Sequence, residues 1–500
     1  MDLEELTGLT VYPRSVTQAD GTTFFLAHGP QEKVLGILGD TTGFERNSQF
    51  ANSQFAIRNS QFLCPLTPSN VAALRDRLPW LRPVLLGLRT SAGFGDRLGL
   101  ATPGHVRAVR EALRRGSGQA GIAPIFAQQS VRENARTGRT PQQVMDDATW
   151  GVFQEGWREP WGADADHLKT PAVVDAFVAA GYTFFTIDPG DHVNNEAHTA
   201  PPAKVEAKVQ ALPWDALEDT AQDLERRYLG RSFDLGETAL TFERETLWRA
   251  AAKYSRAVAH TVRMYRYLVE HFPESSQLSR RSGFELEISV DETETPTSPE
   301  EHFFIASELR RLGVRWVSLA PRFIGRFEKG VDYIGDLETF SAEFARHVAV
   351  ARALGPYKLS LHSGSDKFSI YPIVARLADG LVHLKTAGTS YLEALRAIAQ
   401  VDPALFREIL AFARERYKTD RATYHVSAQL AQVPVPSALS NADLPTLLEQ
   451  FDARQVLHVT YGSVLDQFGD RLLEGLRKYE ETYYNLLESH FRRHLSPFTG

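Results

Sequence analysis

Cysteine is almost absent from this chain of 500 residues, since Cys64 is the only one. No disulfide can therefore form within the chain, and such cysteine usage is typical of proteins from a reducing compartment. The amino terminus, MDLEELTGL, is acidic and lacks the basic segment and apolar core of a secretory signal peptide. We therefore predict a cytoplasmic protein.

Long apolar runs and a strong charge imbalance are absent too. No apolar run approaches the roughly 18 residues that a membrane-spanning helix needs, so we predict no membrane span. The formal net charge of -7 gives no reason to expect a nucleic acid or an acidic membrane as a partner. A small molecule is the expected partner, and the sequence leaves open whether the chain forms a homo-oligomer.

Short apolar segments alternate with helical patterns over much of the chain, which is typical of repeated β-α units. We predict a TIM-like (β/α)8 barrel, a fold in which the chemistry gathers where the strands end. The helix after the fifth strand should begin with a capping box formed by Ser298 and Glu301. The predicted strands are 83–89, 122–129, 162–168, 182–188, 284–290, 316–321, 358–364 and 381–386.

Three further segments surround the predicted barrel of 82–400. Residues 1–81 form an accessory segment, in which the NSQF repeat of 46–62 reads as a flexible insertion without chemistry. A helical insertion at 201–280 follows the fourth strand, and a helical extension occupies 401–500. We expect these helices to serve packing, as lids or in oligomer contacts.

The strand FELEISVDE places two glutamates, Glu285 and Glu287, on the face opposite to its apolar residues. In a barrel this second face points inward, where an unpaired charge is costly. One interpretation is a buried ion pair with an arginine or lysine in the barrel floor. The other is that one of the two, Glu287, acts as an acid or base.

Histidines and carboxylates recur at other strand ends. GADADHLKT carries Asp164, Asp166 and His167, while His362 follows LSL and His383 lies in LVHLKT. A single histidine is usually an ordinary packed or surface residue. Several at strand ends favour a metal centre, because imidazole and carboxylate are common ligands of transition metals. The pattern does not distinguish zinc, manganese, iron, cobalt and nickel, and no tight metal motif is present.

An anionic group of a substrate could bind where the last strand meets a helix. Lys385 and the Thr386–Ser390 turn lie there, and free N–H groups at a helix start attract anions. Arg322 and Asp188 lie at two other strand ends and are further candidates for substrate binding, although loop salt bridges and turn caps would also explain them.

Five longer blocks carry a resemblance to a known family. They read WGADADHLKT, FELEISVDETETPTSPEEH, SLAPRFIGRFEKGVDYIGD, KLSLHSGSDKFSIYP and HLKTAGTSYLEALR. In these blocks the chain resembles the tagaturonate epimerase family of bacterial hexuronate catabolism. The resemblance implies a metal-dependent barrel enzyme that interconverts D-tagaturonate and D-fructuronate. The NSQF insertion is not a feature that we associate with this family.

The resemblance also implies roles for single residues. Asp166 looks like the proton acceptor and Glu287 like the proton donor, while His167 and His362 look like metal ligands. We expect His383 as the third ligand, with Glu328 of the GRFEKG segment as a rival.

Two mechanisms fit the implied reaction, because the two keto acids differ at the carbon beta to the ketone. Retro-aldol cleavage and re-addition is one, and direct proton exchange between two bases is the other. Other functions also stay open: a ketohexose 4-epimerase acting on fructose and tagatose, another metal-dependent isomerase or aldolase, a glycoside hydrolase using two carboxylates, and a sugar-binding barrel without chemistry.

Overall fold

The computed structural model describes residues 2–29, 32–46, 63–116, 121–236, 238–272 and 283–499. The NSQF repeat at 47–62 lies outside the described residues, so its predicted flexibility stays a prediction.

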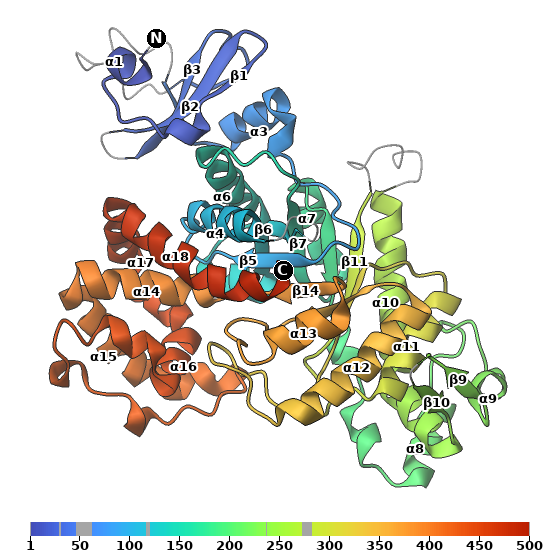
Figure 1. The fold of residues 1–500 in the computed structure, drawn as a ribbon. Helices are drawn as coiled ribbons and strands as arrows, with labels where there is room; N and C mark the ends of the chain where they lie inside the picture. The colour runs from blue at the N-terminus through green and yellow to red at the C-terminus, as the bar shows by residue number, and fades with distance from the viewer. Residues whose placement is uncertain are drawn as a thin grey trace.

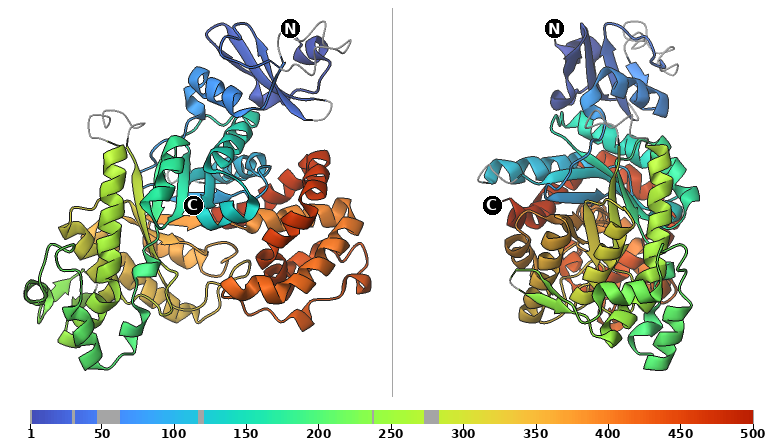
Figure 2. Two further views of the ribbon diagram at one scale, coloured as in Figure 1. Left: turned by 180° about the vertical axis from the view of Figure 1, so that it is seen from behind. Right: turned by 90° about the vertical axis from the view of Figure 1, so that its right-hand side faces the viewer.

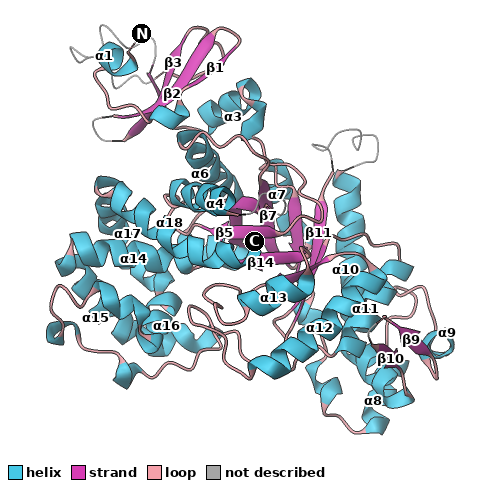
Figure 3. Ribbon diagram, in the orientation of Figure 1, coloured by secondary structure: helices cyan, strands magenta, loops and turns pink. Residues whose placement is uncertain are grey.

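Eight parallel strands form a closed barrel, which confirms the predicted fold class (Figures 1 and 3). Around the barrel the order is β11-β12-β13-β14-β5-β6-β7-β8, and β8 pairs with β11 to close it. The outward side chains of each strand are small or apolar and pack beneath the surrounding helices. The strands are β5 (Ser91–Gly95), β6 (Ala123–Ser130), β7 (Gly162–Leu168), β8 (Phe184–Ile187), β11 (Glu285–Val290), β12 (Ser318–Pro321), β13 (Lys358–Leu361) and β14 (Val382–Lys385).

The first strand is not where the sequence predicted it. Residues 83–89 form no strand, and β5 comprises SAGFG instead, in which four of the five residues are small. The apolar run packs Val84 and Leu86 against Ala123 and Ile125, at the amino ends of the barrel strands. The prediction was wrong because the more hydrophobic segment closes the floor of the barrel, whereas the strand itself needs small residues.

Gly95 shows this need most clearly. A Cβ built on it would lie 2.7 Å from Cα of Ala387, a backbone atom that cannot turn away. We expect Gly95→Ala to destabilise the protein by about 1–3 kcal/mol through overpacking. Gly469→Ala is the matched control, because its Cβ meets nothing within 4 Å inside a helix, and alanine favours helix. Thermal unfolding should show a lower Tm for Gly95→Ala alone; equal Tm values would contradict the close approach.

Helices cover the outside of the barrel on all sides (Figure 2). Helix α11 begins with the predicted capping box, since the hydroxyl of Ser298 accepts from the N–H of Glu301 and the Glu301 carboxylate accepts from the N–H of Ser298. The helices of the barrel layer are α4 (Thr102–Arg115), α5 (Val131–Thr137), α6 (Pro141–Gln154), α7 (Pro171–Ala179), α11 (Pro299–Arg311), α12 (Leu337–Leu354), α13 (Tyr371–Ala378) and α14 (Thr389–Val401).

A small antiparallel sheet precedes the barrel and lies apart from it at one end (Figure 1). Lys33 of this sheet contacts Glu480 of the last long helix at 2.8 Å, so the amino-terminal part packs against the carboxy-terminal extension. The elements of this part are α1 (Leu3–Thr7), β1 (Thr17–Ala19), β2 (Thr22–His28), β3 (Lys33–Leu38), β4 (Leu63–Pro65) and α3 (Pro68–Arg77).

The insertion after the fourth barrel strand is mainly helical and includes a two-stranded sheet. It comprises α8 (Pro202–Gln210), α9 (Ala221–Tyr228), β9 (Ser232–Asp234), β10 (Ala239–Thr241) and α10 (Arg244–His271). The carboxy-terminal extension comprises α15 (Pro403–Asp420), α16 (Phe451–Val459), α17 (Tyr461–Lys478) and α18 (Glu480–Leu495). Among the helices described here, none is both long and apolar enough to cross a membrane.

Candidate active site

Asp166 and His167 both reach the carboxyl end of the barrel because β7 is irregular there. Neighbouring residues of a strand normally point to opposite faces. The pairing of β7 with β8 shifts between Ala165 and Leu168, and His167 has a φ of 58°, in the left-handed region. Nδ1 of His167 consequently lies 2.9 Å from Oδ1 of Asp166. Such backbone strain outside glycine is often found at functional sites.

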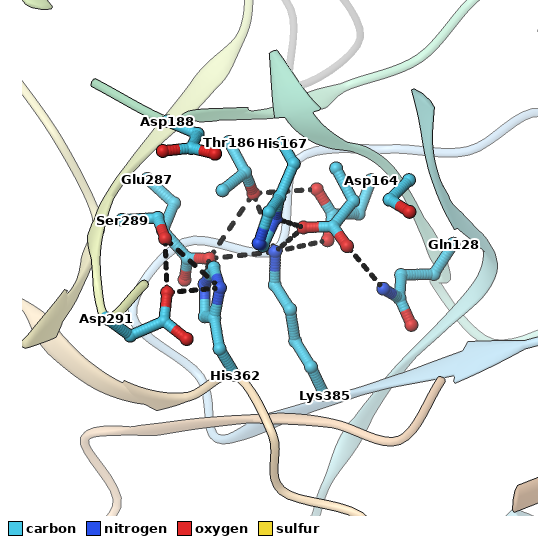
Figure 4. Close-up of polar contacts among 12 residues, drawn as sticks. Gln128, Asp164, His167, Thr186, Asp188, Glu287, Ser289, Asp291, His362 and Lys385 are labelled. Carbon is cyan, nitrogen blue, oxygen red and sulfur yellow. Dashed lines mark hydrogen bonds and ion pairs between the residues drawn. The ribbon is translucent and has the colours of Figure 1, made fainter. Parts of the chain in front are cut away.

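Lys385 is the centre of the site (Figure 4). Its ammonium lies 2.6 Å from Asp166, 2.9 Å from Asp164 and 2.9 Å from Glu287, and it donates to the hydroxyl of Thr186 at 2.7 Å. The side chain is 1% exposed. Burial alone would lower the pKa of Lys385, but Asp164 and Asp166 outweigh it and raise this pKa well above the usual value. Lys385 is therefore a fixed positive charge that holds three carboxylates together.

Glu287 and His362 form a second buried pair. Nε2 of His362 lies 2.5 Å from Oε1 of Glu287, and Nδ1 of the same ring lies 3.2 Å from Asp291. Ser289 donates to Asp291 at 2.5 Å, which fixes that carboxylate beside the imidazole. The rings of His362 and His167 are 5.0 Å apart between centroids. Strands β7, β11 and β13 thus bring two carboxylates and two imidazoles to one place.

The charges of this cluster depend on one another. Burial raises the pKa of both Asp166 and Glu287. His167 and Lys385 outweigh this effect at Asp166, and Lys385 and His362 outweigh it at Glu287. Both pKa values therefore lie well below the usual range. Burial raises the pKa of Asp164 to about 7 despite the nearby Lys385. Asp166 and Glu287 are consequently ionised near neutral pH, and Asp164 is the carboxyl that can hold a proton there.

Each of the two predicted catalytic carboxylates keeps one oxygen available. Oδ1 of Asp166 contacts Lys385 and His167, whereas Oδ2 accepts from Nε2 of Gln128, at 3.2 Å. Thr186 and His362 contact Oε1 of Glu287, whereas Oε2 has no hydrogen-bond partner in the described part of the chain. The arrangement fixes each side chain through one oxygen and leaves the other oxygen without an ion pair among the described residues.

The donor groups fit a divalent cation. An oxygen of Asp166 and one ring nitrogen each of His167 and His362 lie within 4.8 Å of one another, and His167 also shares such a group with Asp188 and Glu292. Burial and Lys385 would lower the pKa of His362, but Asp291 and Glu287 raise it to about 9.

Carboxylates also outnumber cations around these donors. Six of them lie in the cluster around the two imidazoles, and three cations contact five of the six. Such a cluster favours a bound divalent ion, and imidazole with carboxylate is an ordinary donor set for transition metals. The six are Asp164, Asp166, Asp188, Glu287, Asp291 and Glu292, and the three cations are Lys385, Arg132 and Lys169.

His383 does not join this donor group. It pairs in register with Ser91, and its Nδ1 lies 2.9 Å from the hydroxyl of that serine, two residues before Lys385 and so one layer deeper in the barrel. Burial lowers its pKa to about 3, so the ring is neutral. The rival, Glu328, is held by Ser427 and Gln455 of the carboxy-terminal extension. Among the described residues, neither His383 nor Glu328 belongs to a group of side chains close enough to share a metal ion.

The three predicted substrate-binding residues lie in different surroundings. Lys385 has its contacts inside the cluster. Asp188 accepts from the N–H of Gly190 at 2.8 Å and lies 3.7 Å from Lys169, close to His167. Arg322 lines an outer hollow together with Asp291.

An inner hollow lies directly over the cluster. Asp166, His167 and His362 line it, and so do several residues that the sequence analysis missed. Arg97 is one of them; it lies just after β5, so a correct assignment of the first strand would have placed it at a strand end. The other missed residues are Gln128, Ser130, Arg132, Glu133, Lys329, Tyr424 and His458, while Ala387 belongs to the predicted Thr386–Ser390 turn.

Comparison with known proteins gives a consistent result along the whole chain. The model of a family described as tagaturonate epimerase matches residues 12–498. A curated relative, the tagaturonate/fructuronate epimerase of Thermotoga maritima, is 44% identical over 495 residues, which cover 99% of this chain and 98% of the relative.

Solved structures agree with the match in sequence. The fructuronate-tagaturonate epimerase of Cohnella laeviribosi, in complex with one glycerol, has a TM-score of 0.89 and 36% identity, covering 99% of this chain and 98% of that chain. Its complex with two glycerols has a TM-score of 0.89 and 37% identity at the same coverage.

Proposed function

The chain belongs to the tagaturonate epimerase family, and from this premise we propose that it interconverts D-tagaturonate and D-fructuronate. One observation carries the proposal beyond membership of the family: Asp166 and Glu287 share the ammonium of Lys385, beneath a hollow lined by cations and imidazoles. An acid–base pair beside positive charge suits an anionic sugar better than a neutral glycan.

Retro-aldol cleavage is the route that the chemistry of the substrate favours. The carbon to be inverted is beta to the ketone, so its own hydrogen is not acidified by that carbonyl. Asp166 removes the proton of the hydroxyl on this carbon through Oδ2. The bond to the carbon beside the ketone then breaks, leaving an aldehyde and an enediolate. The aldehyde turns, the enediolate carbon adds to its other face, and Glu287 protonates the new alkoxide.

The proton that Glu287 donates needs a source, because the pKa of Glu287 is held low. The hydroxyl of Thr186 lies 2.9 Å from Asp164 and 3.3 Å from Glu287. Asp164, with a pKa of about 7, can therefore supply a proton to Glu287 through this hydroxyl. The proton that Asp166 has taken up then returns to Asp164 before the next turnover, while Lys385 holds all three carboxylates in place.

A divalent cation would be held by His167 and His362, with the carboxylate of Asp166 as the third donor within reach. When bound, it supplies Lewis-acid stabilisation of the negative charge that develops on the substrate oxygens. Asp291 accepts from the second nitrogen of His362 and so orients that ring. We leave His383 outside the ligand set, because it lies one layer below.

The test is conversion of D-tagaturonate by the purified protein in D2O, followed by NMR. We expect D-fructuronate with hydrogen retained at the inverted carbon, because in the retro-aldol route that hydrogen stays on the aldehyde. Deuterium at this carbon would support direct proton exchange instead. Conversion of D-tagatose but not of D-tagaturonate would contradict the proposed substrate. A cytoplasmic location stays a prediction, and the oligomeric state stays open.

A further inference from the structure

The inner hollow holds two cations that the cluster below does not neutralise. We propose that Arg97 and Lys329 bind the carboxylate of the sugar acid and thereby select uronates over neutral ketoses. This inference rests on the proposed function, since it assigns the part of the same site that recognises the acid group. It keeps the Thr386–Ser390 turn of the sequence-based expectation, but it replaces Lys385 and Arg322 by Arg97 and Lys329.

Arg97 presents an unused donor edge to the hollow. Its Nε and one terminal nitrogen donate to the same oxygen of Glu133, at 2.9 and 2.8 Å, and its guanidinium stacks on Tyr461 with 3.7 Å to the ring centroid. The other terminal nitrogen is buried and has no hydrogen-bond partner among the residues that the structure describes. The whole residue is 5% exposed. A buried guanidinium that is oriented on three sides and unpaired on the fourth is suited to bind a carboxylate.

Lys329 is the second cation on the wall of the hollow. Its ammonium donates to the hydroxyl of Ser363 at 2.8 Å. In the described ranges no carboxylate lies within ion-pair distance of it, whereas Arg132 on the same wall is already paired with Glu292 at 3.0 Å. The half-buried ammonium of Lys329 therefore has N–H groups and a positive charge that can bind a further anion.

The start of α14 adds to the positive potential at this place. The helix begins at Thr389 without a side-chain cap, and Ala387, just before it, lines the same hollow. The amino end of a helix attracts anions. Gly388 keeps the space open, because a Cβ there would lie 3.0 Å from the guanidinium of Arg97 and 2.3 Å from the ring of His458.

The position suits the reaction. The carboxylate of the substrate is two bonds from the carbon that is inverted, so it must bind in the hollow that contains Asp166. Arg97 and Lys329 line that hollow, whereas Arg322 lines only the outer one and Lys385 lines neither. In the retro-aldol route this carboxylate remains on the aldehyde fragment. An anchor at its acid end would let the aldehyde turn without leaving.

Steady-state kinetics with D-tagaturonate test this inference. We expect Lys329→Met to raise KM about 10- to 100-fold, the loss typical of a hydrogen bond to a charged group, with kcat changed far less. Lys329→Arg should restore most of the affinity. Arg97→Met should also raise KM. Because this variant loses the ion pair with Glu133 and could fold poorly, Lys329→Met is the decisive variant. Lys204→Met, which removes a charge from the exposed surface of α8, is the control.

Inhibition by D-tagatose, the neutral analogue, separates recognition of the acid from general damage. Its inhibition constant should stay the same in Lys329→Met, because this ketose has no carboxylate to lose. Equal weakening of both compounds would overturn the inference, and so would a raised KM in Arg322→Met with none in Lys329→Met. A wild-type protein that turns over neither keto acid would remove the proposed function itself, whereas active wild type with unchanged variants would remove only this inference.

Discussion

Replacing Asp166 by asparagine should lower kcat for D-tagaturonate by a factor of about 1,000 or more, and Glu287→Gln should have a similar effect. General acid–base groups contribute roughly 100- to 10,000-fold, and each of these side chains also balances the buried charge of Lys385. Rates are best measured by a discontinuous assay that separates the two keto acids, so that slow variants remain measurable.

Glu285→Gln is the matched control for both variants. Glu285 lies on the same strand as Glu287, two residues before it, and is also buried inside the barrel. Burial raises its pKa, and its carboxylate accepts from the N–H of Gly87 in the floor of the barrel. We expect its kcat to stay within about tenfold of wild type, since it has no acid–base role. Activity within tenfold for Asp166→Asn and Glu287→Gln alike would refute the assignment of the acid–base pair.

Removal of metal should have the second largest effect. Thorough chelation should lower turnover at least about 100-fold, because Lewis-acid stabilisation of a developing charge is worth several kcal/mol. Activity should return with one of zinc, manganese, iron, cobalt or nickel. His362→Ala should lose the bound metal as measured by elemental analysis, whereas His383→Ala should retain it. Retention by His362→Ala with loss by His383→Ala would contradict the ligand set.

The affinity for metal should also rise with pH. The pKa values of His167 and His362 are raised in the metal-free protein, that of His362 to about 9, so both rings carry a proton at neutral pH. A metal must displace these protons, which makes binding tighter as pH increases toward 9, by up to about tenfold per pH unit for each proton released. Calorimetry in two buffers of different ionisation enthalpy would count them. Binding that is independent of pH would contradict this account.

The sequence was sufficient to find most of the cluster because strand geometry is simple. A period of two puts Glu287 on the inner face of its strand, and strand ends meet at one end of a barrel, which brings Asp166 and His362 to the same place. The position of His167 has a different origin. Regular alternation would have turned its side chain away from Asp166, and only the irregularity of β7 brings the two together.

The sequence could not predict how deep each inward-pointing side chain lies along the barrel axis. His383 and Lys385 share the inner face of one strand, but the level of each depends on how the strands are staggered. Arg97 was missed for another reason. Hydrophobicity placed the first strand at 83–89, so the residue that follows the true strand was never at a predicted strand end. The hydrogen bonds from Ser427 and Gln455 to Glu328 join residues 99 and 127 positions apart, so no local sequence pattern predicts them.

The most direct test of the central claim approaches equilibrium from both sides. The metal-loaded protein is incubated with D-tagaturonate in one sample and with D-fructuronate in another, and both are followed by 13C NMR. A single active site that inverts one carbon reversibly must bring the two samples to the same final ratio, with no other product accumulating. Conversion that stops at different ratios, yields another product, or is absent from both samples would contradict the proposed epimerase function.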